Sequence, residues 1–206
     1  MTAALPVEAG FFEPVYQAAQ HSGVVSTIPL LLQLLDEPRP PVGPAGIAAV
    51  VGELPTGWSP LATVTLPEGP VHFARPPSGA DPASPAWHLG LLWLRLGASV
   101  GRRGACVRHL ADRRAGDSVI LHQQLVKGQL ADVLVQHLEV AAMLRALEAD
   151  GPGPATRHHV HGDITAADRA LLRLFGASGF VQPGPGLEEH VSELLADAYA
   201  GTGTSA

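Results

Sequence analysis

The stretch that decides the fold covers residues 119–149 and reads VILHQQLVKGQLADVLVQHLEVAAMLRALEA. It contains no proline, and its apolar residues recur at helical spacing. The pattern predicts one helix of about 30 residues, or roughly 45 Å in length. Because the apolar positions wrap widely around this helix, we expect it to be buried on more than one side.

Helical patterns also flank this stretch. Residues 86–111 predict a second long helix, and a short connection at 113–118 predicts that the two pack antiparallel. A third helix is expected to start near Thr165, where Thr165-x-x-Asp168 can cap its first turn. Residues 187–198 predict a fourth.

The first 80 residues have a different character. A helix is predicted from Pro14 to Leu35, bent or broken near Pro29. A proline-rich linker follows, and then come short apolar runs between turn residues, which predict a small β meander. The fold class is therefore mainly α. We expect residues 1–80 to form a reduced N-terminal helix with a small β segment, and residues 86–202 to form a helical bundle.

Composition narrows the class of protein. Of the 206 residues 46% are hydrophobic and 16% are charged, which favours a folded domain over a disordered chain. The net charge of −6 argues against a nucleic-acid partner. The longest apolar stretch, Val24 to Leu35, is too short for a membrane span, and the N-terminus has no secretory signal pattern, so we expect a cytoplasmic protein without a membrane partner.

Two motifs on the helices carry a resemblance to a known family. The first comprises Arg113-x-x-Gly116-Asp117-Ser118, then Gln124, then Leu130-Ala131-Asp132. The second comprises Leu174-Phe175-Gly176-Ala177-Ser178-Gly179-Phe180, followed by Tyr199-Ala200-Gly201-Thr202. In order and spacing, residues 87–202 resemble the C-terminal helical domain of acyl-CoA dehydrogenases. A competing alignment places His161-Gly162-Asp163-Ile164 on the same glycine turn, but it requires a deletion in the helix.

The resemblance implies which positions should carry chemistry, and two of them have changed. The family's catalytic base is the Glu of Tyr-Glu-Gly-Thr, and that position is Ala200, which cannot accept a proton. The alternative base of some members lies on the first long helix of this domain, and no Asp or Glu occurs between Pro82 and Ala111. The chain therefore resembles a truncated, degenerate member, or pseudoenzyme.

The cofactor positions implied by the resemblance are also altered. The arginine that would grip the flavin pyrophosphate is replaced by Ser118, with Asp117 beside it. Arg113 and Gln124 remain as candidate cofactor-binding residues. We expect no flavin to be bound by the chain alone, and FAD to be available only through a partner subunit.

Another candidate site is a group of polar residues at 158–163. His158, His159, His161 and Asp163 are expected to lie together in a loop before the third helix, where His159, His161 and Asp163 are candidate acid–base residues. The pattern lacks the further ligands that a metal needs, so we expect no metal site.

Two functions remain open from the sequence. One is a non-catalytic or accessory subunit of a flavin-dependent acyl-thioester dehydrogenase, paired with a full-length acyl-CoA dehydrogenase-like subunit or with further copies of itself. The other is a repurposed enzyme that needs no flavin, such as a cyclase, isomerase or dehydratase, working through the histidine group.

Overall fold

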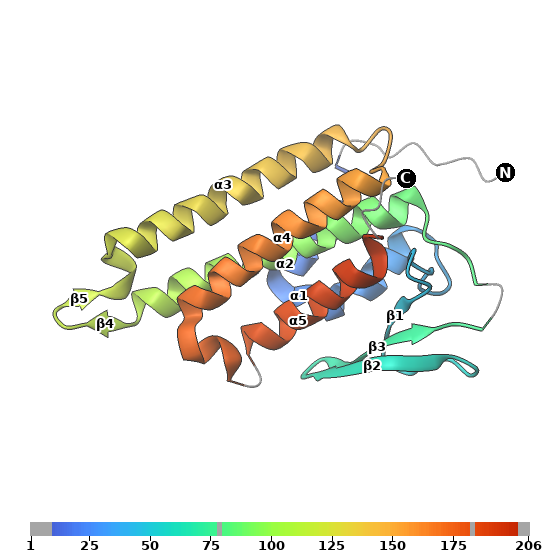
Figure 1. Ribbon diagram of the computed structural model, residues 1–206, viewed down its shortest axis with the longest axis horizontal. Helices are drawn as coiled ribbons and strands as arrows, with labels where there is room; N and C mark the ends of the chain where they lie inside the picture. Colours follow the sequence, from blue (N-terminus) through green and yellow to red (C-terminus); the bar gives the residue numbers. More distant parts are fainter. Residues whose placement is uncertain (1–9, 78–79, 182–183, 202–206) are drawn as a thin grey trace.

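The computed structural model describes residues 10–77, 80–181 and 184–201, and within these it is mainly helical with a small sheet (Figure 1). Its helices are α1 (Glu13–Leu34), α2 (Pro85–Ala111), α3 (Gln124–Ala146), α4 (Pro154–Phe175) and α5 (Pro185–Tyr199), with short 3₁₀ turns at Ile120–His122 and Gly176–Phe180. Its strands are β1 (Ala48–Val51), β2 (Ser59–Leu66) and β3 (Gly69–Arg75), with a two-residue hairpin of β4 (Arg114–Ala115) and β5 (Ser118–Val119). This confirms the expected fold class. Thr202 of the second motif lies outside the described residues.

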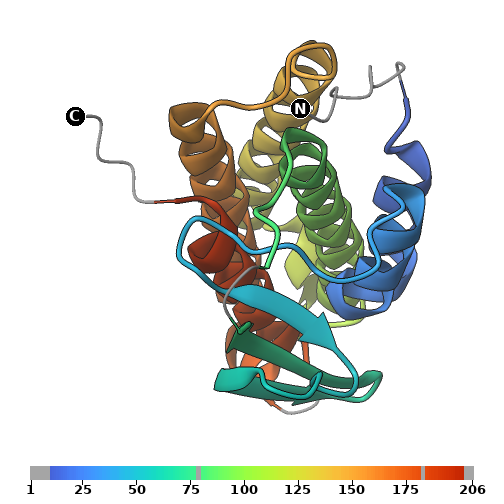
Figure 2. The ribbon, with the colours of Figure 1, turned by 90° about the vertical axis from the view of Figure 1, so that its right-hand side faces the viewer.

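Helix α2 is the centre of the bundle. It packs against α1, α3 and α4, and every residue from Trp87 to Ser99 is buried. The view along the bundle shows α1 on one side of α2 and α4 with α5 on the other (Figure 2). One apolar core extends from Phe12, the residue just before α1 in the sequence, through the sheet to Tyr199 at the end of α5. The expected division of the chain into residues 1–80 and 86–202 stays a prediction.

The sheet is antiparallel, with β3 between β1 and β2. Strand β1 therefore pairs with β3, whereas a simple meander would pair it with β2. The phenol of Tyr199 fastens the end of α5 to this layer, since it donates to the carbonyl of Pro41 at 3.0 Å and accepts the N–H of Ala49 at 3.1 Å. These two hydrogen bonds hold Tyr199 in place and so fix the position of the next residue, Ala200.

The break in α1 lies at Gly23 and not near Pro29. Gly23 has φ 76° and ψ −175°, a conformation that residues with a side chain rarely adopt. A Cβ there would collide with the carboxylate of Glu188 on α5. Pro29 remains inside the helix. Glycine at position 23 therefore permits both the break in α1 and the close approach of α5.

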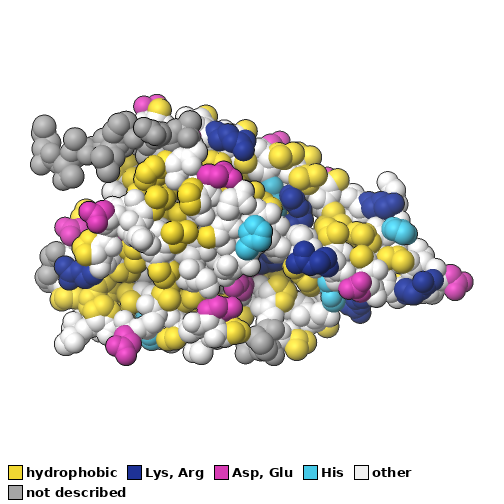
Figure 3. All heavy atoms as spheres, turned by 180° about the vertical axis from the view of Figure 1, so that it is seen from behind, with side chains coloured by type: hydrophobic (Ala, Val, Ile, Leu, Met, Phe, Trp, Pro, Cys, Tyr) yellow, Lys and Arg dark blue, Asp and Glu magenta, His cyan; other side chains and the backbone are white. Residues whose placement is uncertain are grey.

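Helix α3 is shorter and more exposed than the sequence predicts. It starts at Gln124, after the hairpin and a 3₁₀ turn, and buries only Val133, His137, Val140 and Leu144. On its outer side Leu138 is 61% exposed. The prediction that this helix is buried on more than one side is thus wrong for the described chain. Viewed from behind, apolar side chains reach the surface towards the end that carries the hairpin β4–β5 (Figure 3).

Helix α4 begins at Pro154, so the expectation of a loop at 158–163 and a cap at Thr165 is wrong. Proline suits the first turn of a helix, where its missing N–H has no partner to lose. Val160, Ile164 and Leu171 then share one buried face at helical spacing. This apolar register outweighs the cost of Gly162 in the helix interior.

Polar side chains inside the bundle join α2 to its neighbours. Arg102 of α2 and Asp168 of α4 form a buried ion pair. Ser99 lies 2.8 Å from Nε2 of His137 on α3, and Arg103 lies 3.0 Å from its Nδ1. Because arginine can only donate, Nδ1 of His137 accepts, and its Nε2–H donates to Ser99. No helix of the described chain is long and apolar enough to cross a membrane.

The two glycines at issue give opposite expectations for stability. Gly162→Ala should stabilise the fold by about 0.5–1 kcal/mol, because alanine favours the helix and the new Cβ meets nothing within 4 Å. Gly23→Ala should destabilise it by more than about 1 kcal/mol, since the positive φ and the Glu188 carboxylate both oppose a side chain. Urea unfolding of the two variants measures both. A loss of stability in Gly162→Ala would contradict a helix at 158–163.

The buried His137 predicts a pH effect on stability. Burial first, and then the charge of Arg103, lowers its pKa to about 4, whereas an unfolded histidine titrates near pH 6.5. Below about pH 6.5 the unfolded chain binds the proton that the folded chain refuses. The contribution of neutral His137 is therefore complete above pH 6.5 and is lost as the pH falls to about 4.

We expect His137→Gln to lose less stability than the wild type between pH 6.5 and 4, by up to about 3 kcal/mol. Glutamine can still donate to Ser99 and accept from Arg103. Urea unfolding across this range measures the difference. Burial raises the pKa of Glu189 to about 7, which acts in the opposite direction but equally in both proteins. The exposed His159→Gln is the control, and equal slopes for His137→Gln and the wild type would refute the effect.

Candidate functional site

A cleft of about 460 Å³ lies between α4, the C-terminal end of α5 and the segment before β1. This volume suits a small organic ligand. Its lining residues are mostly small and apolar, with a few polar groups from α4 and α5: Pro44, Ala45, His158, His161, Gly162, Thr165, Ala196, Asp197, Ala200 and Gly201.

Ala200 contributes only a methyl group to this cleft. Its position is set by Tyr199, whose hydroxyl is bonded to the backbone of Pro41 and Ala49. The one carboxylate in the lining belongs to Asp197, and it is exposed. The cleft therefore contains no buried carboxylate among its described lining residues that could act as a base in a dry site.

The guanidinium of Arg95 lies behind the wall of the cleft. It is fully buried, and it donates from Nε to Ser192 on α5 at 2.9 Å and from Nη2 to Thr165 at 2.9 Å. Its Nη1 lies 2.6 Å from Nδ1 of His161 and 3.3 Å from the carbonyl of the same residue. Burial lowers the pKa of Arg95 to about 10, so it stays charged at neutral pH. In the described residues no carboxylate lies within ion-pair distance of it.

The contact with Arg95 fixes the protonation of His161. Arginine can only donate, so Nδ1 of His161 must accept, and the hydrogen of the neutral ring is on Nε2. Burial, followed by the nearby charge of Arg95, holds the pKa of His161 well below its ordinary value. The Nε2–H is buried and has no hydrogen-bond partner in the described part of the chain. His161, which lines the cleft, thus carries a neutral, unpartnered donor.

The three acid–base candidates do not converge. His159 and Asp163, one helical turn apart, form a pair on the outer surface with 3.4 Å between Nε2 and Oδ2. His161, between them in sequence, points to the other side of α4 and is buried. A helix separates residues that the expected loop would have brought together. In the described residues, no group of three or more metal-ligating side chains is found.

The two candidate cofactor-binding residues lie at the other end of the bundle, next to the hairpin β4–β5 (Figure 1). Arg113 and Gln124 are both exposed. The guanidinium of Arg113 contacts its helical neighbour His109 at 3.2 Å, and the hydroxyl of Ser118 contacts the carbonyl of Val119 at 3.4 Å. These three exposed side chains form no buried cradle for a flavin.

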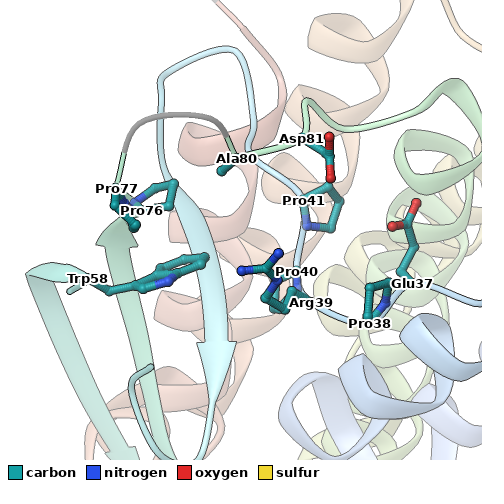
Figure 4. A pocket seen from close by; sticks show the side chains of 10 residues that line it. All are labelled: Glu37, Pro38, Arg39, Pro40, Pro41, Trp58, Pro76, Pro77, Ala80 and Asp81. Carbon is teal, nitrogen blue, oxygen red and sulfur yellow. The ribbon is translucent and has the colours of Figure 1, made fainter. Parts of the chain in front are cut away.

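A second, smaller hollow of about 90 Å³ lies between the proline-rich segments and the sheet. Figure 4 shows the guanidinium of Arg39 turned towards the indole of Trp58, with prolines around them. Glu37 and Asp81 also line it, and burial, followed by the charge of Asp81, raises the pKa of Glu37. This hollow is too small for an organic substrate. Other hollows, of about 340, 280 and 270 Å³, are also smaller than the cleft at Ala200, which is therefore the candidate site.

Sequence reasoning missed the residues that shape this cleft. Arg95, Thr165 and Ser192 are common residue types inside helical patterns, and only their meeting in space gives them meaning. A signal was present at Arg95, because an arginine in an otherwise apolar helix must find partners. Ala200 was found from the motif, and it does line the cleft.

No protein-family profile matches the chain, and no curated protein matches it. Solved structures do match. An acyl-CoA dehydrogenase from Slackia heliotrinireducens superposes with a TM-score of 0.54 at 14% identity, over 77% of this chain and 46% of that one. A glutaryl-CoA dehydrogenase from Mycobacterium smegmatis, in complex with FADH2, gives a TM-score of 0.51 at 17% identity, over 77% of this chain and 51% of that one.

A further match is the ChsE4–ChsE5 complex from Mycobacterium tuberculosis, with a TM-score of 0.51 at 14% identity, over 76% of this chain and 46% of that one. The chain spans about half the length of these proteins. Likeness at such low identity shows the fold and not the activity. Over about three-quarters of its length, the chain has the fold of acyl-CoA dehydrogenases.

Proposed function

We propose that this chain is a non-catalytic, accessory subunit of a flavin-dependent dehydrogenase of acyl thioesters. Its partner is a full-length acyl-CoA dehydrogenase-like subunit that supplies both FAD and the catalytic base. The observation that carries the proposal is the methyl group of Ala200 in the cleft, at the position where the resemblance implies a carboxylate. A methyl group can take no part in removing the α-proton of a thioester.

The cofactor side supports the same proposal. The chain keeps Arg113 and Gln124, but both are exposed at the hairpin end and form no cradle. Such residues can contribute only to a site that another subunit completes. The match to a dehydrogenase solved with FADH2 makes FAD the cofactor to seek in that partner.

The outer side of α3 offers a surface for such a partner. Gly128, Ala131, Val135, Leu138 and Ala142 are spaced alternately three and four residues apart along this side. We call these five residues the α3 stripe. All are exposed, and they lie on the side of α3 opposite its buried residues. Apolar residues at this spacing are typical of a helix that packs on another helix.

A two-chain assembly also has a counterpart among the structural matches. The ChsE4–ChsE5 structure is a complex of two named chains. An assembly of an incomplete chain with a complete one is therefore the arrangement we propose here, in the cytoplasm, with an acyl thioester as the substrate of the assembly. A stable homo-oligomer without a flavin-bearing partner is the outcome that opposes it.

The rival function, a flavin-independent enzyme, keeps one supporting observation. His161 lines the cleft and has an unpartnered Nε2–H, whereas His159 and Asp163 face away. If the rival holds, His161→Gln abolishes turnover of its substrate and His159→Gln does not.

The test of the proposal is purification of the tagged chain from its native cells. We expect the chain expressed alone to be colourless, and the native eluate to contain FAD that is reduced when an acyl-CoA is added. The double variant Val135→Glu/Leu138→Glu should lose at least 90% of this FAD, since an unpaired charge in an apolar helix interface costs more than the about 1–3 kcal/mol of an unpaired neutral polar group. Absorbance of the flavin measures each result.

A matched control separates the stripe from general apolar surface. Leu61 on β2 is 52% exposed, so Leu61→Glu changes a comparable side chain away from α3. We expect it to retain the flavin-bearing partner. A yellow preparation of the chain alone, or full retention of FAD by the double variant, would overturn the proposal.

A further inference from the structure

Among the described residues, Arg95 has no carboxylate within ion-pair distance. Arg95 and Arg102 are both buried on α2, and Asp168 pairs directly with Arg102. Arg95 donates only to neutral groups, namely Ser192, Thr165 and His161. The carboxylates of Asp168, Glu193 and Glu189 act on Arg95 only at longer range. A positive charge without a direct partner therefore lies behind the wall of the cleft, where the low dielectric strengthens its field.

Two groups that can donate contact this charge, and both belong to residues that line the cleft. Nδ1 of His161 accepts from Arg95, which leaves the buried Nε2–H without a partner. The oxygen of Thr165 accepts from Nη2 of Arg95, which leaves its hydroxyl hydrogen free to donate. Both residues line the cleft, and both are polarised by the same guanidinium. An oxygen acceptor with negative charge would satisfy them together.

The rest of the cleft limits the ligand further. Pro44, Ala45, Ala196 and Ala200 give apolar walls. Among the lining residues that the structure describes, the one carboxylate is that of Asp197, which is exposed at the surface. It would repel a negatively charged group of the ligand. The ligand should therefore carry its charge towards α4 and an apolar body along α5.

We propose that this cleft binds a carboxylate ligand with a compact apolar body, held by donation from His161 and Thr165 and by the charge of Arg95. This site does not rest on the proposed accessory function, because it uses only this chain's own residues. The class of ligand follows from two donors, one buried cation and small apolar walls.

The test uses the purified chain alone at pH 7 with three probes of one shape. Hexanoate carries the carboxylate, hexanamide a neutral carbonyl, and hexylammonium a positive charge. We expect hexanoate to bind at least about tenfold more tightly than hexanamide, because charge-assisted hydrogen bonds are stronger, and hexylammonium not to bind. Calorimetry measures affinity, and ¹⁵N NMR of the His161 ring should show an Nε2–H signal that shifts only with bound ligand.

Variants place the site. A Cβ added at Gly162 meets nothing within 4 Å, so Gly162→Leu should fill the cleft without disturbing the core and should weaken hexanoate binding at least about tenfold. Ala166→Leu, on the exposed part of the same helix and outside the lining, is the matched control and should bind normally.

Separate variants test the donor Thr165 and the carboxylate of Asp197. Thr165→Val should weaken binding roughly threefold to tenfold, and Thr165→Ser should restore it, because one hydrogen bond is removed and returned. Asp197→Asn should tighten it, since a repelling carboxylate is neutralised. No binding of hexanoate to the wild type, equal binding of hexanamide, or normal binding by Gly162→Leu would each overturn the proposal. None of these results depends on a partner subunit.

Discussion

The buried guanidinium of Arg95 is the interaction on which the bundle and its cleft both depend. A buried cation costs several kcal/mol unless its donors are satisfied. Arg95 on α2 meets this requirement with Thr165 and His161 on α4 and with Ser192 on α5. Since these groups must arrive together, they favour the register in which the three helices pack. That register places Ala200, just after α5, in the same cleft as His161.

The sequence predicted elements whose cause is local and missed those whose cause is tertiary. The long helices, their tight connection and the short strands follow from apolar spacing and turn residues. The break at Gly23 was not predicted, although glycine is the residue that tolerates its positive φ and leaves room for Glu188 of a distant helix. The start of α4 was missed as well. Thr165 and Asp168 look like a cap in sequence, but both lie inside α4, where their partners are Arg95 and Arg102 of α2.

The candidate site shows the same division. A motif was enough to single out Ala200, which the structure places in the cleft. The prediction that the histidines at 158–163 lie together was wrong because residues close in sequence were expected to share a loop. In the helix that forms instead, His159 and His161 lie on different sides. The tautomer of His161 could not be predicted at all, since it is set by Arg95 from 66 residues away. The polar contacts of this site join side chains from different helices, and the pattern of a single sequence does not show which helices pack together.

The α3 stripe and the cleft are separate surfaces, and both involve a helix that packs against α4. Helix α4 contacts both α3, which carries the stripe, and α5, which borders the cleft. On one side Gln136 of α3 donates to the carbonyl of Asp163 at 2.9 Å, and on the other His161 and Thr165 face Arg95. A shift of α4 by a fraction of a turn would therefore disturb both. The proposed partner surface and the proposed ligand site therefore share α4 without sharing a contact residue.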